Sequence, residues 1–185
     1  MNCTLILGGA RSGKSAWAER LAAASGKQVV YIATAQAGDG EMAARIDHHR
    51  ERRPASWTTV EEPLALGDAI LRWSAPDRLV LVDCLTLWLS NLMFCGEADL
   101  PDVGRIDLPP RFELEHTRFL KALAHAPGEV LLVSNEVGMG IVPFGAVTRR
   151  FADEAGRLNQ ATAAIAGRVV MLAAGLPLVL KGAPC

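Results

Sequence analysis

The sequence predicts an α/β fold in which helices flank a mostly parallel β-sheet. Short apolar runs alternate with longer amphipathic segments along the 185 residues, a rhythm typical of strand-helix-strand units. A glycine-rich loop at residues 8–15 connects the first apolar run to the first amphipathic segment. Hydrophobic residues make up 50% of the chain and charged residues 21%, which is a globular composition. We therefore expect a single domain over residues 1–185.

In the first half of the chain, apolar runs predict buried strands at 3–7 and 29–33. Helical spacing of apolar residues predicts helices at 16–24, 41–53 and 64–73. The second of these helices ends before Pro54, because proline cannot continue a helix.

The second half repeats the alternation. We expect strands at 79–83 and 129–134, and helices at 85–94, 111–125 and 145–166. Residues 95–110 are rich in Gly, Pro and Asp and predict a surface excursion. Two final strands, at 168–173 and 178–181, flank a predicted turn at 175–177. This closing pair predicts antiparallel strands at the C-terminal edge of the sheet.

The glycine-rich loop matches the phosphate-binding pattern G-x-x-x-x-G-K-[ST]. The fixed positions are filled by Gly8, Gly13, Lys14 and Ser15. A strand before the loop and a helix after it would aim backbone N–H groups and a helix N-terminus at phosphate oxygens. Lys14 would then reach the terminal phosphates, and the Ser15 hydroxyl would bind Mg²⁺. The loop predicts a nucleoside triphosphate site.

Asp83 ends the apolar strand predicted at 79–83. In a protein with a phosphate loop, such an acid typically holds Mg²⁺, directly or through water. The alternative is that Asp83 caps the helix that follows.

The predicted helix at 41–53 combines adjacent histidines with a cluster of arginines. At 100° per residue, His49 lies beside the apolar stripe of Met42 and Ile46, whereas His48 points outward. Cations around a histidine disfavour its protonation and would neutralise charge on a phosphate under attack. His48 is therefore a candidate nucleophile, and the alternative is a solvated basic helix with incidental histidines.

These motifs resemble those of the bifunctional adenosylcobinamide kinase / adenosylcobinamide-phosphate guanylyltransferase family of cobalamin biosynthesis. Beyond the phosphate loop, the resemblance rests on Tyr31-Ile32-Ala33-Thr34-Ala35, on Glu41-Met42-Ala43-Ala44-Arg45-Ile46-Asp47-His48-His49, and on Arg53-Pro54, Trp57 and Glu61. It continues with Asn-Glu-Val-Gly-Met-Gly-Ile-Val-Pro at 135–143 and Ala-Gly-Arg-Leu-Asn-Gln at 155–160. The pieces span nearly the whole chain.

The resemblance implies a RecA-like fold, a homotrimer and two reactions. A nucleoside triphosphate, ATP or GTP, phosphorylates adenosylcobinamide. GTP then gives GMP to His48, and the GMP passes to adenosylcobinamide phosphate. Catalytic roles fall on His48 and Lys14, and Mg²⁺ binding on Ser15 and Asp83. The nucleotide-binding positions implied are Gly8, Gly9, Ala10, Arg11, Ser12, Gly13, Lys14, Ser15, Ala33, Thr34, Ala35, Arg50, Glu51, Arg52, Arg53, Glu61 and Asp83.

Two rival functions stay open at this point. The first is a small-molecule kinase in which His48 only binds phosphate. The second is a nucleotide-dependent switch or assembly protein. Further alternatives concern single segments: residues 135–143 form either a ligand loop or a plain turn, and Glu61 contacts guanine or ribose, or else begins a helix. Arg149, Arg150 and Arg157 contact phosphate or form surface ion pairs.

Charge and cysteine usage narrow the class of protein further. A net charge of −1 gives no sign of nucleic-acid binding. The apolar runs are too short to span a membrane, and the first strand begins without a basic, apolar leader before it. Cys3, Cys84, Cys95 and Cys185 lack metal-site spacing, and we expect Cys3 and Cys84 to be small buried hydrophobes. We therefore expect a cytoplasmic protein.

Overall fold

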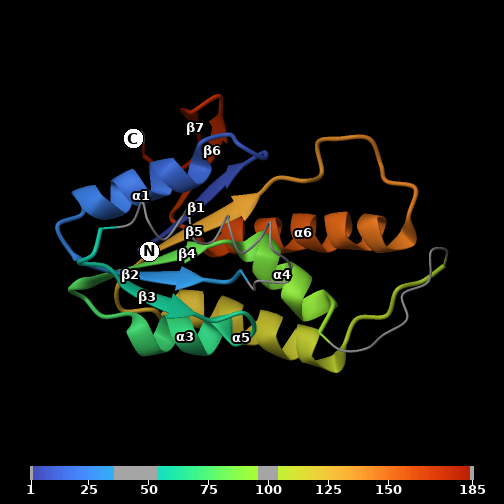
Figure 1. Cartoon of the computed structure of the whole chain (residues 1–185), viewed down its shortest axis with the longest axis horizontal. Helices are drawn as coiled ribbons and strands as arrows, with labels where there is room; N and C mark the ends of the chain where they lie inside the picture. The colour runs from blue at the N-terminus through green and yellow to red at the C-terminus, as the bar shows by residue number, and fades with distance from the viewer. Residues whose placement is uncertain (1, 36–53, 96–103, 184–185) are drawn as a thin grey trace.

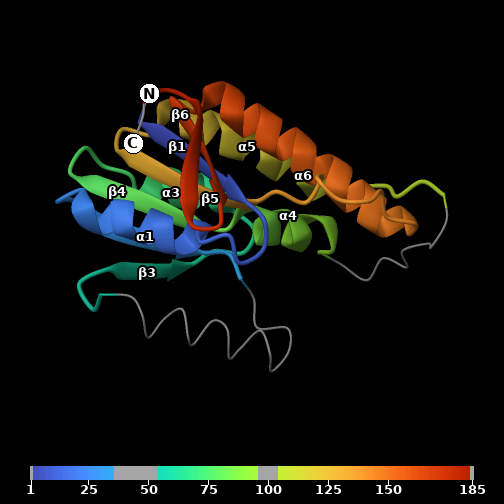
Figure 2. The same cartoon turned by 90° about the horizontal axis from the view of Figure 1, so that it is seen from above.

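The computed structural model describes residues 2–35, 54–95 and 104–183. A seven-stranded sheet runs in the order β3-β2-β4-β5-β1-β6-β7 (Figure 1). Neighbouring strands are parallel except for β6 and β7, which are antiparallel. The predicted fold class is therefore confirmed, including the antiparallel pair at one edge. Figure 1 shows β3 and β7 at opposite edges of the sheet, and Figure 2 shows α1 on one side of the sheet with α6 on the other.

The inner strands are almost completely buried because helices cover both faces of the sheet. Leu5, Ile32 and Val80 belong to the cluster that faces α3, α4, α5 and α6. Ile6 and Leu81 belong to a second cluster, which faces α1. The strands are β1 (Cys3–Gly8), β2 (Gln28–Ala33), β3 (Thr58–Glu61), β4 (Arg78–Asp83), β5 (Glu129–Asn135), β6 (Arg168–Ala173) and β7 (Leu176–Lys181).

Five helices are described, and they fall on the two faces of the sheet as Figure 1 shows. Trp17 anchors α1 on one face, whereas Trp88 of α4 and Phe119 of α5 pack at a ring distance of 4.9 Å on the other. None of the helices in the described part of the chain is both long and apolar enough to cross a membrane. The helices are α1 (Lys14–Ala24), α3 (Leu66–Trp73), α4 (Leu85–Met93), α5 (Pro110–His125) and α6 (Ala146–Ile165).

Strand β3 was not expected from the sequence. Its residues Thr-Thr-Val-Glu lack an apolar run, because the strand lies at the sheet edge with three of its four residues exposed. Pairing with β2 creates the strand, with Val30 opposite Thr58 and Ala33 opposite Glu61. Tertiary pairing here overrides weak local propensity.

The turn between β6 and β7 lies earlier than predicted. Ala174 and Gly175 reverse the chain with φ values of 52° and 78°, and β7 starts at Leu176. Pro177 therefore belongs to the strand rather than to the turn. An edge strand accepts proline because one of its sides makes no ladder hydrogen bonds.

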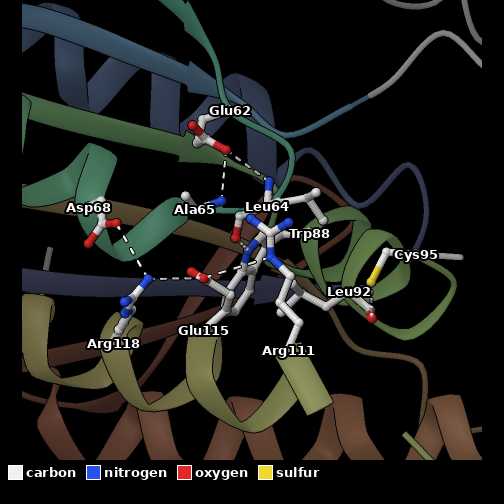
Figure 3. A network of polar contacts seen from close by, with 10 residues as sticks. All are labelled: Glu62, Leu64, Ala65, Asp68, Trp88, Leu92, Cys95, Arg111, Glu115 and Arg118. Atoms are coloured by element: carbon white, nitrogen blue, oxygen red, sulfur yellow. Dashed lines mark hydrogen bonds and ion pairs between the residues drawn. The ribbon is translucent and has the colours of Figure 1, made fainter. Parts of the chain in front are cut away.

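Glu62 organises the start of α3. Its Oε1 accepts hydrogen bonds from the N–H groups of Leu64 and Ala65 at 3.0 and 2.7 Å (Figure 3). The alternative that Glu61 begins the helix is therefore wrong, because Glu61 ends β3 and its neighbour makes these bonds. The Nε1 of Trp88 donates to the Leu64 carbonyl at 2.8 Å, which ties the same turn to α4.

Figure 3 also shows the ion pairs around Arg118 of α5, one of which reaches α3. The carboxylate of Glu115 is buried, and its Oε1 lies 3.3 Å from a guanidinium nitrogen of Arg118. The same nitrogen lies 3.8 Å from a carboxylate oxygen of Asp68 on α3. One ion pair, between Arg118 and Asp68, therefore joins the two helices in addition to their apolar contact.

Two helical glycines give a matched test of this packing. A Cβ on Gly67 of α3 would lie 2.8 Å from backbone atoms of Arg118 and Phe119, whereas a Cβ on Gly156 of α6 meets nothing within 4 Å. We expect Gly67→Ala to lower the free energy of unfolding by about 1–3 kcal/mol through overpacking. Gly156→Ala should raise it by about 0.5–1 kcal/mol through helix propensity. Urea denaturation measures both, and equal effects would contradict the close packing of α3 on α5.

Candidate active site

Four parallel strands bring the predicted site residues to the carboxyl edge of the sheet. Gly8 lies opposite Asn135, and Ala33 lies opposite both Asp83 and Glu61 in the strand register. In open α/β sheets, ligands bind outside the carboxyl ends of the strands. The fold therefore gathers the phosphate loop, Ala33, Glu61 and Asp83 along one ligand-binding edge.

The phosphate loop curls back on itself between β1 and α1. Ser12 N–H donates to the Gly9 carbonyl at 3.3 Å, and Gly175 N–H donates to the Ser12 carbonyl at 2.9 Å. Gly13 has a φ of 91°, a left-handed conformation that favours glycine. The β6–β7 turn thus supports the loop from one side.

The start of α1 has the features of an anion site. Gly13 caps the helix without any side-chain hydrogen bond, and the first turn contains no acidic residue. The N–H groups of that turn therefore keep their capacity to bind phosphate. Lys14 is buried, and its Nζ donates to the Gly9 carbonyl at 3.2 Å, so the ammonium lies over the loop.

Glycines 8 and 9 differ in the space around them. A Cβ on Gly8 would lie 2.4 Å from Ser12 Oγ and 2.7 Å from the Leu172 carbonyl oxygen, whereas one on Gly9 meets nothing within 4 Å. We expect Gly8→Ala to weaken nucleotide binding at least about tenfold and to destabilise the fold by about 1–3 kcal/mol. Gly9→Ala should leave the unfolding midpoint unchanged.

Calorimetric titration with GTP and thermal unfolding measure these two effects. A Gly8→Ala protein with wild-type affinity and midpoint would contradict the close approach of the loop to β6.

Asp83 does not cap α4, and its carboxylate lies at the carboxyl end of β4. The cap residue of α4 is Cys84, and no side chain makes a capping hydrogen bond there, so the capping alternative is wrong. The hydroxyl of Tyr31 donates to Asp83 Oδ2 at 3.1 Å. A carboxylate and the Ser15 hydroxyl are oxygen donors of the kind that Mg²⁺ prefers, so the residues present fit this ion.

The family follows from comparison of the whole chain. Residues 4–180 match the family model described as cobinamide kinase / cobinamide phosphate guanyltransferase. The chain belongs to this family. It is 55% identical over 180 residues to the bifunctional adenosylcobalamin biosynthesis protein CobP of Pseudomonas aeruginosa, covering 97% of this chain and 98% of that protein. It is 43% identical over 179 residues to CobU of Escherichia coli, covering 96% of this chain and 98% of that protein.

Solved structures support the fold of this cobinamide kinase family member. An ATPase of a bacterial type III secretion system superposes with a TM-score of 0.56 at 15% identity, covering 96% of this chain and 56% of that one. The ATPase EscN of enteropathogenic E. coli gives 0.52 at 14% identity, covering 94% and 43%. At these identities the likeness concerns the fold alone.

Burial makes the thiols of Cys3 and Cys84 unreactive. Burial raises the pKa of Cys84 to about 11, and the neighbouring Asp83 carboxylate contributes to the rise. Burial also raises the pKa of Cys3 to about 12. Both thiols stay protonated at neutral pH, which makes them poor nucleophiles and metal ligands. The expectation that Cys3 and Cys84 are small buried hydrophobes is confirmed.

The segment 135–143 leaves the sheet beside the phosphate loop. Glu136 N–H donates to the Gly8 carbonyl at 3.0 Å, and the Glu136 carboxylate accepts from Gly138 N–H at 2.7 Å. Figure 1 shows the chain projecting beyond the sheet after β5 before it enters α6. Ile141 and Phe144 are 95% and 98% exposed. The segment is an apolar surface that begins at the phosphate loop.

The arginine side chains of α6 make ion pairs or hydrogen bonds to other residues of the chain. Arg150 and Arg157 form ion pairs with Glu154, which confirms the ion-pair interpretation for these two residues. Arg149 donates instead to the carbonyl oxygens of Pro143 and Phe144 and so ties the apolar segment to the helix.

Several predicted residues lie outside the described ranges. These include the helix predicted at 41–53 with His48, Arg50, Glu51, Arg52 and Arg53. Sequence reasoning did not find the side-chain role of Tyr31 or the hydrogen bonds of Thr34 and Asn91. The hydrogen-bond partner of a hydroxyl or an amide does not follow from the sequence, because it depends on which strands are neighbours in the sheet.

Proposed function

We propose that this chain phosphorylates adenosylcobinamide with ATP or GTP and then transfers GMP from GTP to the product, giving adenosylcobinamide-GDP. Family membership supports this proposal. The structural observation that carries it is the uncapped, acid-free N-terminus of α1 with Lys14, on the same sheet edge as Asp83. This arrangement suits a triphosphate and the metal ion that accompanies it.

In the kinase step, the loop N–H groups and Lys14 bind the phosphates of the nucleotide and neutralise charge on the transferred group. The acceptor hydroxyl attacks the γ-phosphorus and releases its proton to solvent, the bond to the bridging β-phosphate oxygen breaks, and the nucleoside diphosphate leaves. Mg²⁺, when bound, orients the triphosphate and neutralises its charge, and Ser15 and Asp83 would hold it. Positioning carries most of this reaction, so the protein needs no covalent intermediate.

In the second reaction, an imidazole nitrogen of His48 attacks the α-phosphorus of GTP, and pyrophosphate leaves from the phosphate loop. A phosphate oxygen of adenosylcobinamide phosphate then attacks the same phosphorus and restores the histidine. The intermediate divides one difficult exchange into two displacements. The nucleotide contacts proposed outside the loop are Ala33, Thr34, Ala35, Arg50, Glu51, Arg52, Arg53 and Glu61.

The acceptor needs an apolar surface near the phosphate loop. The exposed segment after β5 begins at the Gly8 carbonyl and presents Met139, Ile141 and Phe144, which are 75%, 95% and 98% exposed. Large exposed apolar patches mark interaction sites. This location supports an acceptor as large as a corrinoid better than it supports a small polar substrate.

We propose in addition that the protein is a cytoplasmic homotrimer that binds no nucleic acid. A row of leucines supports the assembly, because Leu176, Leu178 and Leu180 alternate along the edge strand β7 and are 71%, 60% and 54% exposed. The three cysteines that the structure describes are free thiols, which suits a reducing compartment. Sedimentation equilibrium measures the trimer.

Two experiments, one with γ-labelled nucleotide and one with α-labelled GTP, test the proposed function. With γ-labelled nucleotide, radioactivity should pass to adenosylcobinamide, and with α-labelled GTP the protein should take up an acid-labile label. A plain kinase would give the first result without the second. A switch or assembly protein would give neither and would not bind the corrinoid.

A further inference from the structure

Thr34 is the first residue after β2, and its side chain bridges to the end of β4. The side chain is fully buried. Its Oγ1 donates to the Cys84 carbonyl oxygen at 2.8 Å and accepts from the Cys84 N–H at 2.9 Å. The Thr34 N–H donates to the Asp83 carbonyl at 3.3 Å. One residue thus makes three hydrogen bonds to the Asp83–Cys84 pair.

The Thr34 hydroxyl makes hydrogen bonds to the backbone of Cys84 that a paired strand makes elsewhere in the sheet. The register between β2 and β4 ends at Ala33 and Asp83, so Cys84 lies one residue beyond the last paired position. Cys84 is only 5% exposed. Without the Thr34 hydroxyl its backbone N–H would lose this partner, and its carbonyl would keep only the bond from the Trp88 N–H at 3.2 Å. A hydroxyl both donates and accepts, so a single side chain satisfies both groups.

Thr34 is itself held by α4. The Asn91 side-chain amide donates to the Thr34 carbonyl at 2.8 Å and to the Pro63 carbonyl at 3.1 Å. The Asp83 carboxylate is oriented separately by the Tyr31 hydroxyl at 3.1 Å. Asp83 is therefore restrained twice, through its backbone and through its side chain.

We propose that Thr34 is a positioning residue that holds the carboxyl end of β4, so that Asp83 meets the metal ion of the bound nucleotide. The inference rests on the proposed function, which assigns Mg²⁺ to Ser15 and Asp83. Mg²⁺ demands near-ideal octahedral geometry, so a small shift of one ligand weakens its binding. Residues that orient a metal ligand typically change metal affinity about 10–100-fold when they are replaced.

The test uses two variants of one position. Thr34→Val keeps the branched shape but removes donor and acceptor, whereas Thr34→Ser keeps the hydroxyl. Adding Mg²⁺ should raise the GTP affinity of wild type. We expect Thr34→Val to reduce that gain by about tenfold or more, and Thr34→Ser to keep the gain within about threefold of wild type. Calorimetric titration of GTP, with Mg²⁺ or with a chelator, measures that gain without any turnover. Thr59→Val, on the exposed edge strand β3, is the matched control.

The outcomes separate positioning from a general loss of structure. An undiminished Mg²⁺ effect in Thr34→Val overturns the proposal, and so does an equal loss of affinity with and without the ion. Where Thr34→Val does not fold, Asn91→Ala decides, with an expected loss of about threefold or more in the Mg²⁺ effect and no change in the chelated state. Wild type that binds GTP with Mg²⁺ yet transfers no phosphate or GMP would contradict the proposed function while leaving the Thr34 comparison valid.

Discussion

His48→Ala should abolish the acid-labile GMP label while leaving phosphorylation of adenosylcobinamide within about threefold of wild type. The reason is that only the second reaction needs a covalent nucleophile. Loss of a nucleophile that forms an intermediate typically removes about a thousandfold or more of the rate. Uptake of α-labelled GTP, followed by acid treatment, measures the label, and γ-phosphate transfer measures the kinase step.

The adjacent histidine is the control for this prediction. In the helix predicted at 41–53 from the sequence, His49 falls beside the apolar stripe of Met42 and Ile46, so we expect His49→Ala to keep the label. A label that persists in His48→Ala would assign the nucleophile to another residue. Loss of the label in His49→Ala with retention in His48→Ala would reverse the assignment.

Lys14→Met should lower both reactions by about a hundredfold to a thousandfold, because both use the phosphate loop to bind charge that develops in the transition state. Methionine keeps the length and the burial of the side chain, so the loop should still fold. Rates with γ-labelled and α-labelled nucleotide measure the two effects in the same protein.

Lys27→Met is the matched control, because Lys27 pairs with Glu129 at 3.2 Å at the amino ends of β2 and β5, away from the phosphate loop. We expect its rates to stay within about twofold of wild type, since a partly exposed surface ion pair contributes about 1 kcal/mol or less to stability. If Lys14→Met impairs one reaction alone, the idea that a single loop serves both reactions is wrong.

The elements with strong local signals were predicted well. All six predicted strands formed, five of them within one residue of their expected bounds, and the long helix predicted at 145–166 became α6 (Ala146–Ile165). The edge strand β3 was missed because its residues carry no apolar run, and the β6–β7 turn moved because proline is tolerated in an edge strand. Edges of a sheet are where local patterns and final structure differ most.

The candidate site also combines residues that a local sequence pattern predicts with contacts that only the fold creates. The phosphate loop was predicted because its chemistry lies in eight consecutive residues, 8–15, whose backbone forms the site. A helix-start role was considered only for Glu61, as an alternative, and Glu62 takes it instead, since a difference of one position decides which residue ends β3. The bond from Tyr31 to Asp83 joins residues that are 52 positions apart, and no local pattern announces it.

The sequence by itself determined the fold class, the phosphate loop and the acid at the end of β4, because periodicity, glycine and hydroxyl placement act over short distances along the chain. Only the tertiary structure decided which strand lies beside which, and therefore that Thr34 bonds to Cys84 and that Glu136 bonds to Gly8. These contacts depend on the order β2-β4-β5-β1 within the sheet. Hydrogen bonds act over about 3 Å, so residues far apart in sequence become partners only when the sheet has brought them together.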